Sequence, residues 1–546
     1  MNKLLIIPFW FLIQWSFGQS TVGLIDYQSG NSEGYVLFSP TTSTTTYLID
    51  KCGNKVHEWN STYKPALASY LLEDGSLLRT GQLDNLNFDE GGSGGIIEKF
   101  DWDGNLTWSY SISDNFQCQH HDVKFLPNGN VLAIVWERYT SAELIAEGKN
   151  TTYANSFILS EKIVELQPSG TNGATLVWEW KVWDHLIQDF DNTKPNYGVV
   201  ANSPGLINLN YFPGMSTNTD WIHLNSIDYN PTLDQILVSS HTFCEVWILD
   251  HSTTTAQAAT NLGGNSGTGG NIMYRWGNPQ AYGRGNPSVK KLYGQHHATW
   301  IPTGFPNAGK ILVFNNGLNR TAGVYSSIDM IETPAMVNNL YPIVGTTAFA
   351  PTSLFWTYTD PVPTDFYSSN ISGVYPLENG SFMITNGTAG IFFEITSINE
   401  KVWEYISPIN STGILTQGNV PSGNLVFRCN YYPSTYSAFI GRTITDLGEI
   451  ELNPTSPSIC EIYAGVKTIE KEENILAVFP NPSNDIISVT INKDEINKIE
   501  VISSQGIVVL STNESTFSVT GLKTGIYFLK VYSSNENILL KKIIKN

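Results

Sequence analysis

The stretch Pro127-Asn128-Gly129-Asn130-Val131-Leu132 joins a turn to an apolar run, and it decides the fold because the chain repeats it. Asn-Gly and related pairs favour tight turns, and an apolar run that follows such a turn favours a β-strand. Five other places carry a turn of this kind before an apolar run: Glu73–Leu78, Pro231–Leu237, Gly309–Leu312, Glu378–Phe382 and Pro421–Leu425. The chain therefore contains six copies of one turn-and-strand element.

A second element alternates strictly with the first. It is an aromatic residue or histidine, then any residue, then an aromatic residue, at the end of a β-like run. Residues two apart in a strand point to the same face. The six copies are His57–Trp59, Trp108–Tyr110, Trp178–Trp180, Tyr274–Trp276, Trp356–Tyr358 and Trp403–Tyr405. Six such units predict an all-β fold, a six-bladed β-propeller whose paired rings form the core between blades. Extra polar, Gly-rich sequence at residues 181–222 and 252–273 is expected to form loops over one face.

Composition excludes several classes of partner. The chain has 546 residues, a formal net charge of -19 and only 14% charged residues. Nucleic acid or an anionic membrane surface would require a basic face, so neither is an expected partner. Fifteen Trp and twenty-six Tyr, without long helical periodicity, are typical of a turn-rich exported β protein.

The N-terminus predicts export. A basic start at Met1–Lys3 precedes an apolar run from Leu4 to Trp15, and small residues follow at Ser16–Gly18. This is the pattern of a signal peptide, residues 1–18, cleaved before Gln19. The apolar run is too short for a stable membrane span, so we expect no transmembrane helix in the mature chain.

Five cysteines are present, and none has the CxxC spacing of a zinc or redox site. Two of them, Cys52 and Cys460, lie near the two ends of the large predicted domain. They are the candidates for a disulfide that staples the domain closed; the remaining cysteines are Cys118, Cys244 and Cys429.

Histidines carry the main functional signal. The chain has only nine, and five of them stand just upstream of an apolar run: His120, His121, His223, His296 and His297. His121 and His296 each stand six residues before a proline, and so does Asn225. The innermost strands of a propeller line its central channel, so we expect these polar groups to converge there from different blades.

Two chemistries could use such a cluster. Three histidines with the neighbouring Asp122 could bind a metal, although no HxH or HExxH spacing is present. Alternatively, a neutral imidazole could take an electrophilic group from a donor while cations hold the anionic oxygens. Arg320 and Arg428 are the candidate cations, and no metal or cofactor is then needed.

Several motifs resemble the bacterial arylsulfotransferase (aryl-sulfate sulfotransferase) family over most of residues 30–450. They are Trp221–Tyr229, Val246–Thr253, Tyr274–Pro279, Gly294–Ala298 and Phe366–Gly373. The resemblance implies a six-bladed propeller that moves sulfuryl groups between phenols without PAPS or another cofactor, through a sulfohistidine.

The resemblance also implies residue roles. His296 matches the nucleophile, His223 and Asn225 match an HxN pair, and His121 (or His120) matches a histidine from the earlier blade. Where the family usually has an arginine, this chain has His241, a weaker and pH-dependent cation. Either His241 takes the role of that arginine, or Arg320 or Arg428 supplies the cation instead. His297 leaves the identity of the nucleophile open by one position.

The C-terminal segment is a separate small domain. Residues 461–476 are expected to be a linker, after a propeller domain at 19–460. Residues 477–546 alternate like the short strands of a β-sandwich. Phe479-Pro480-Asn481-Pro482, the Gly521–Tyr527 motif and a basic end at Lys541–Lys545 resemble the type A sorting domain of the type IX secretion system. That resemblance implies secretion or surface display, with the type IX machinery as partner.

The sequence thus predicts a secreted aryl-sulfate sulfotransferase that acts on a small aryl sulfate donor and a phenolic acceptor by a ping-pong mechanism. Two alternatives remain at this level. One is a secreted propeller that binds a glycan or phenolic ligand without turnover, and the other is a metal- or quinone-dependent oxidoreductase.

Overall fold

The computed structural model describes residues 20–153, 156–211, 219–455, 460, 476–491, 495–503, 507–534 and 538–546. Strands dominate these residues, which confirms the all-β class. The α-helices described are two short ones, α1 (Ser141–Ala146) and α2 (Thr255–Ala258). The predicted signal peptide (1–18) and nearly all of the predicted linker (461–475) lie outside the described residues.

The chain divides into two compact units between Ile459 and Cys460. The first unit contains six antiparallel sheets of four or five strands. In chain order from the second sheet, their strands are β5–β8 (Pro65–Leu71, Leu77–Gln82, Gly95–Phe100, Leu106–Ser111), β9–β12 (Gln117–Phe125, Val131–Thr140, Phe157–Ser169, Gly173–Lys181), β15–β18 (Leu224–Asn230, Gln235–Ser240, Glu245–Asp250, Tyr274–Trp276), β19–β22 (His296–Trp300, Ile311–Asn315, Ser327–Ile331, Trp356–Tyr358) and β23–β26 (Gly373–Pro376, Phe382–Asn386, Ile391–Ile395, Lys401–Ile406).

The remaining sheet is built from both ends of this unit. Its order is β29 (Val426–Pro433), β2 (Gly34–Pro40), β3 (Thr45–Asp50) and β4 (Lys55–Asn60). The strand β1 (Gly23–Tyr27) extends the preceding sheet by pairing with β26. Strands from the start of this unit, β1 and β2, therefore pair with strands from its end, β26 and β29.

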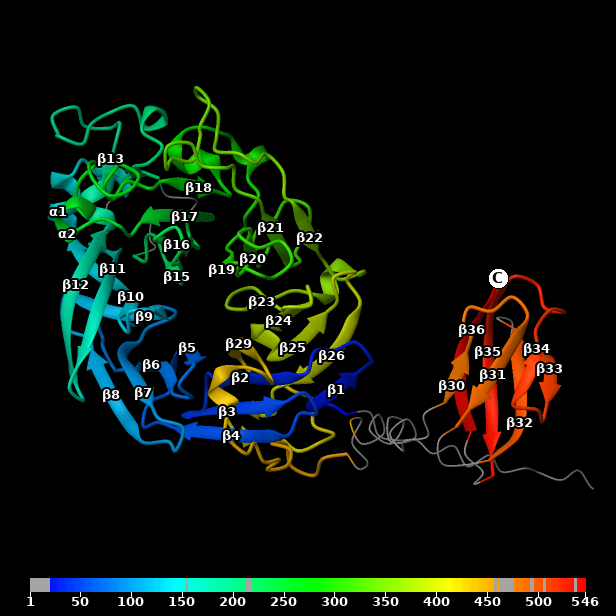
Figure 1. Ribbon diagram of the computed structural model, residues 1–546. Coiled ribbons are helices and arrows are strands. Elements are labelled where there is room, and N and C mark those ends of the chain that lie inside the picture. Colours follow the sequence, from blue (N-terminus) through cyan, green and yellow to red (C-terminus); the bar gives the residue numbers. More distant parts are fainter. Residues whose placement is uncertain are drawn as a thin grey trace, which may run out of the picture. The chain divides into compact units, whose positions relative to one another are not determined.

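One end strand of each sheet contacts the end strand of the next sheet. These innermost strands follow one another in the closed order β5, β9, β15, β19, β23, β29 and back to β5. Figure 1 shows them on the inside of a ring of sheets. Residues at the start of these strands, although far apart in the chain, therefore meet around one central space. Two short strand pairs lie in loops: β13 (Leu186–Ile187) with β14 (Ile207–Asn208), and β27 (Ile409–Asn410) with β28 (Gly413–Ile414).

The predicted aromatic pairs occupy the fourth strands, and five of their tryptophans bind the next sheet. Each donates its indole N–H to a backbone carbonyl there: Trp59 to Asp101, Trp108 to Gly173, Trp180 to Gly270, Trp276 to Pro351 and Trp403 to Lys51. The side chains of these five are at least nine-tenths buried. A buried indole needs such a partner, and a hydrogen bond of this kind contributes on the order of 1 kcal/mol. The repeat thus links five of the six sheets to the next one.

The turn-and-strand copies fall mostly between the first and second strands of a sheet. The exception is Pro421–Leu425, which leads into β29, an innermost strand. The local sequence is the same kind of turn, but the order of strands in that sheet is set by pairing with the distant N-terminal strand β2.

Cys52 and Cys460 are disulfide-bonded. Cys118, Cys244 and Cys429 are buried free thiols.

The second unit has two antiparallel sheets. They are β30–β31–β34 (Ala477–Phe479, Ile486–Thr490, Thr516–Ser518) and β33–β32–β35–β36 (Val508–Thr512, Ile496–Ser503, Gly525–Ser533, Ile538–Lys545). Buried side chains from both sheets form one core, among them Val489, Ile499 and Leu529. Over the part of the chain that is described, no helix is long and apolar enough to cross a bilayer.

Candidate functional site

The site lies where three innermost strands depart from regular pairing. Register shifts occur in β9 between Gln119 and Val123, in β15 at Asn225 and in β19 at His297. Such β-bulges redirect side chains. His121, His223 and His297 also have left-handed backbone, with φ of 50°, 54° and 48°. This conformation is costly for a residue with a side chain and is found most often where function requires it.

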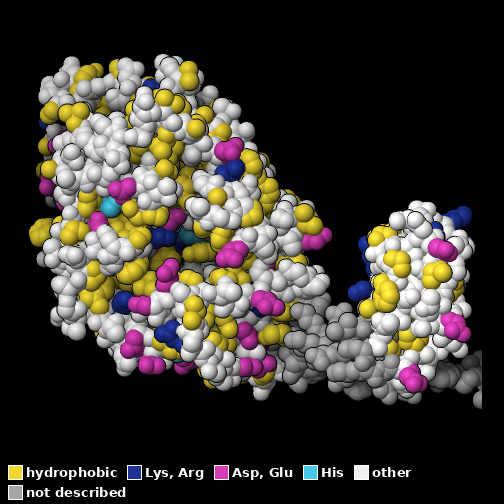
Figure 2. Space-filling model, in the orientation of Figure 1, with side chains coloured by type: hydrophobic (Ala, Val, Ile, Leu, Met, Phe, Trp, Pro, Cys, Tyr) yellow, Lys and Arg dark blue, Asp and Glu magenta, His cyan; other side chains and the backbone are white. Residues whose placement is uncertain are grey.

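Five aromatic rings form a closed circuit at this place. The ring centroids of His121 and His223 lie 4.6 Å apart, those of His223 and His241 lie 5.0 Å apart, and those of His241 and His296 lie 5.3 Å apart. Phe427 of β29 closes the circuit, at 6.5 Å from His296 and 6.1 Å from His121. We call these five residues the histidine ring. Figure 2 shows histidine and cationic side chains inside a central hollow with hydrophobic walls.

His296 is held in one tautomer. Its Nδ1 lies 2.8 Å from Oδ1 of Asn316, and the backbone N–H of Ile371 donates to Nε2 at 3.2 Å. The amide of Asn316 is oriented because its Nδ2 donates to the carbonyls of Ser368 and Ile371. Oδ1 is thus the acceptor, so Nδ1 carries the proton and Nε2 the lone pair. Burial lowers the pKa of His296 to about 3, against the opposing effect of Asn316. The imidazole is therefore neutral and can act as a nucleophile through Nε2.

His223 is the member of the histidine ring whose pKa is raised. Burial lowers its pKa, but the carboxylate of Asp220, which is hydrogen-bonded to Nδ1, and that of Glu90 outweigh burial, so the pKa is raised. The opposite holds for His121 and His241, whose pKa values burial lowers well below the usual range, helped by the charge of His223. The histidine ring thus places one imidazole with a raised pKa beside three imidazoles whose pKa values are lowered.

His120 lies behind the ring. It stacks on Trp136 with centroids 3.9 Å apart, and its Nδ1 lies 2.9 Å from Nδ1 of His121. Its Nε2 lies 2.6 Å from Oε2 of Glu161. His120 thus contacts the site only through His121.

Arg428 is the predicted cation that lies next to the site. Its guanidinium lies 4.3 Å from the ring centroid of Phe427 and contributes to lowering the pKa of both His296 and His297. Its NH2 donates to Oδ2 of Asp122 at 2.7 Å, while its Nε and NH1 are buried without a hydrogen-bond partner in the structure. Asp122 is therefore committed to Arg428, and no group of three His, Cys, Asp or Glu among the described residues is arranged to hold a metal ion.

The other candidates lie outside the histidine ring. His297 accepts a hydrogen bond at Nδ1 from the N–H of Val374 and stacks on Tyr375. Arg320 lies over Tyr325 and donates to Ser327 at 2.8 Å.

Asn225 is fully buried and supports His296 from behind. Its Nδ2 donates to the carbonyl of Gln295 at 2.8 Å. That peptide precedes His296, so Asn225 fixes the start of β19, while its Oδ1 is buried without a hydrogen-bond partner in the structure.

Sequence reasoning missed several residues that complete the site. They are Phe427, Asp220, Glu161, Asn316, Glu90, Gly92 and Lys290, which also lowers the pKa of His241. Asp220 precedes His223 by three residues, and Phe427 adjoins the predicted Arg428, so local sequence carried a weak signal for these two. Glu161 and Asn316 come from other strands or loops and carry none.

The charge of His223 gives a pH prediction. A group whose folded pKa is raised stays charged up to that pKa and loses its charge as pH rises through it. If His223 must be charged to stabilise anionic oxygens, activity falls on the alkaline side. Asp220→Asn removes the main raising effect and leaves only Glu90 to oppose burial, so we expect the alkaline limb of a kcat/KM–pH profile to move to lower pH. The rate near neutral pH should drop about 10- to 100-fold. An alkaline limb that stays in place in Asp220→Asn would contradict this role.

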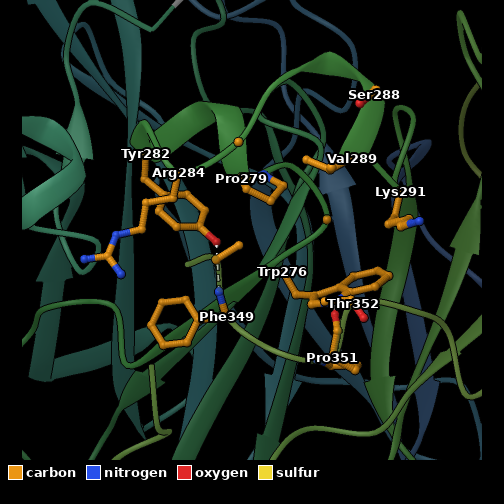
Figure 3. A pocket seen from close by; sticks show the side chains of 13 residues that line it. Trp276, Pro279, Tyr282, Arg284, Ser288, Val289, Lys291, Phe349, Pro351 and Thr352 are labelled. Atoms are coloured by element: carbon orange, nitrogen blue, oxygen red, sulfur yellow. Dashed lines mark hydrogen bonds between the residues drawn. The ribbon is translucent and has the colours of Figure 1, made fainter. Parts of the chain in front are cut away.

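A second cavity, of about 240 Å³, lies away from these residues. Figure 3 shows the rings of Trp276, Tyr282 and Phe349 around it. The guanidinium of Arg284 binds the carbonyls of Ala201, Gly345 and Thr347, so its charge is used to hold loops. None of the predicted site residues lines this cavity.

Comparisons with known proteins match both units. The family model described as arylsulfotransferase (ASST) matches residues 35–412, and that of the secretion system C-terminal sorting domain matches residues 477–546. No curated protein matches the chain. The sorting domain indicates secretion or cell-surface display through type IX secretion and contact with that machinery.

Solved structures resemble the chain only distantly. A protein of unknown function from Bacteroides caccae is 10% identical, with 73% of this chain and 98% of that chain covered and a TM-score of 0.39. A streptogramin B lyase is 12% identical, covering 77% and 96%, with a TM-score of 0.34. A putative 6-phosphogluconolactonase from Bacteroides fragilis is 10% identical, covering 74% and 100%, with a TM-score of 0.36.

Proposed function

This chain belongs to the arylsulfotransferase family, and from that premise we propose that it transfers a sulfuryl group from a phenolic sulfate ester to an acceptor phenol, without PAPS, through a sulfo-adduct on His296. The observation that carries the proposal is the tautomer of His296. The lone pair of His296 is on Nε2. His296 belongs to the histidine ring, and the amide of Asn316 holds its Nδ1.

In the first half-reaction, Nε2 of His296 attacks the sulfur of the donor. The N–S bond forms as the S–O bond to the aryl group breaks, and the electron pair leaves on the phenolate oxygen. The Nε2 lone pair must first exchange its contact with the N–H of Ile371 for the sulfur, and that N–H then points at the region of the sulfuryl oxygens. The adduct ring is cationic, and Oδ1 of Asn316 stabilises it by accepting from Nδ1.

In the second half-reaction, the acceptor oxygen attacks the same sulfur and the N–S bond breaks. The anionic sulfuryl oxygens need preorganised donors in both steps. His223 supplies a charge, His241 supplies an imidazole in the position of the family's usual arginine, and Arg428 supplies unused N–H groups nearby.

His297 is a poorer nucleophile than its neighbour. Both histidines accept a backbone N–H, His297 from Val374 and His296 from Ile371, but His297 lies outside the histidine ring, away from His223 and His241. Arg320 is not needed for the transfer, and Asn225 acts through the peptide before His296.

We also propose an architecture of a six-bladed propeller and a C-terminal β-sandwich. Six sheets whose first strands contact in a closed order support a six-bladed β-propeller over residues 19–460. The shared core of two sheets supports a C-terminal β-sandwich at 477–546, after a linker at 461–476.

The test is a transfer assay on the full secreted chain. With 4-nitrophenyl sulfate alone, we expect a burst of one nitrophenolate per protein, and with an added phenol we expect double-reciprocal plots with parallel lines. Saturable binding of the sulfate ester without any release of nitrophenolate would contradict the proposal and would identify a binding protein instead.

A further inference from the structure

A buried chain of three titratable groups leads away from the histidine ring. Nε2 of His120 and Oε2 of Glu161 are 2.6 Å apart, and Nδ1 of His120 and Nδ1 of His121 are 2.9 Å apart. His120 and Glu161 are fully buried, and His121 is 2% exposed. Of the four imidazole nitrogens of His120 and His121, Nε2 of His121 is the one that makes no contact within this group of three residues.

We propose that Glu161, His120 and His121 form a proton relay in which Glu161 stores the proton that the acceptor phenol gives up and the leaving phenolate takes. This rests on the proposed function, because it assigns a role to residues behind the same site. Glu161 is a positioning and proton-storing residue, since it contacts no reacting atom.

The relay has two arrangements that differ by one proton, and both imidazoles are neutral in each. With Glu161 protonated, its O–H donates to Nε2 of His120, Nδ1–H of His120 donates to Nδ1 of His121, and Nε2 of His121 carries a proton. With Glu161 ionised, each proton has moved one place, so Nε2 of His121 has a lone pair. Each imidazole gains and loses one proton and stays neutral.

Protons balance over the two half-reactions. When the S–O bond breaks, Nε2 of His121 gives its proton to the phenolate oxygen, Nδ1 receives one from His120, and Nε2 of His120 receives one from Glu161. When the acceptor attacks, its O–H proton goes to Nε2 of His121 and the series runs in reverse. No proton has to enter from solvent between the two steps.

The surroundings of Glu161 suit both of its forms. Burial raises its pKa well above the usual range, and the charge of Asp220 adds to this, which favours the acid. The N–H of Leu224 donates to its Oε1 at 3.0 Å, and hydrogen bonds from the side chain of Trp136 and the backbone of His223 also favour the carboxylate. Burial outweighs these hydrogen bonds, so the balance is shifted toward the acid, the form in which Glu161 stores the proton.

The rings of the relay are fixed in place. His120 is stacked on Trp136 at an interplanar angle of 4°. His121 lies against Gly92, where a Cβ would be 2.0 Å from Cε1 of the imidazole, and its own N–H donates to the carbonyl of Gly92. Gly92 has a φ of 94°, so the position favours glycine for two reasons. The close backbone prevents the His121 ring from turning away from His120.

The experiment uses Glu161→Gln and a series of aryl sulfates with leaving phenols of different acidity. The amide can donate to His120 but cannot release a proton to it. In single turnovers without acceptor, we expect a rate within about 3-fold of wild type for 4-nitrophenyl sulfate, whose phenolate needs no proton, and a rate about 100-fold lower for unsubstituted phenyl sulfate. Glu179→Gln, on β12 beside Lys162 and Lys181, is the matched control and should react like wild type.

A second variant guards against misfolding. His120→Phe retains a ring on Trp136 and removes both nitrogens, and it should show the same steeper dependence on leaving-group acidity. Equal slowing of all donors in a folded Glu161→Gln protein would overturn the relay. If wild type gives no burst with any donor, the proposed function fails, a result distinct from failure of the relay.

Discussion

We expect His296→Ala to lose sulfuryl transfer, with kcat/KM reduced by about 10⁴-fold or more, because the rest of the site cannot replace the proposed nucleophile. Wild-type protein exposed to an aryl sulfate should carry one acid-labile SO₃ group on His296, detectable by intact-protein and peptide mass spectrometry. The alanine variant should carry none.

Two other histidine variants sharpen this test. His297→Ala should retain the adduct, because its Nδ1 is occupied by Val374 and it lies outside the histidine ring. His57→Gln, on β4, changes a histidine that binds only the carbonyl of Trp102 and stacks on its ring, and should keep full activity. An adduct on His297 in the His296→Ala protein would reassign the nucleophile by one position.

Arg428→Gln destabilises the first unit by about 3–5 kcal/mol, because it leaves the carboxylate of Asp122 buried without its counter-charge. Both side chains are nearly inaccessible, and the ion pair of 2.7 Å joins β29 to β9 across the ring of sheets. Denaturant unfolding followed by tryptophan fluorescence measures the loss. Activity should also fall, since the N–H groups beside His296 are lost.

The double variant Asp122→Asn with Arg428→Gln separates charge from packing. Replacing both partners removes the unpaired buried charge, so its free energy of unfolding should lie closer to wild type than that of Arg428→Gln alone. Activity should not recover in the double variant. Equal stability of the single and double variants would show that the pair does not act through charge.

Much of the fold could be predicted from local patterns. The alternating turns and aromatic pairs identified an all-β chain, and the pairs fall on fourth strands whose tryptophans bind the next sheet. The copy at Pro421–Leu425 fitted less well, because it leads into an innermost strand. Turn chemistry is local, whereas the position of a strand in its sheet depends on which distant strand pairs with it.

The histidines themselves could also be predicted, but their partners could not. Five histidines in register with a repeat pointed to the central space, and four of the predicted histidines, His121, His223, His241 and His296, share one circuit there. Arg320 lies apart from it, against Tyr325 and Ser327. Sequence spacing gave no means to choose between Arg320 and Arg428, because only the structure shows that Arg428 lies in the innermost strand β29 and Arg320 in the loop after β20.

By itself, the sequence determined which strands form and which histidines stand at their inner ends, because turn preferences and the two-residue period of a strand act over a few neighbouring residues. Only the tertiary structure decided the chemical state of each histidine. Asn316 fixes the proton of His296, Asp220 raises the pKa of His223, and Glu161 reaches His121 through His120. These states depend on burial and on contacts that β-bulges and left-handed residues create between separate sheets, and neither is written in any short stretch of the chain.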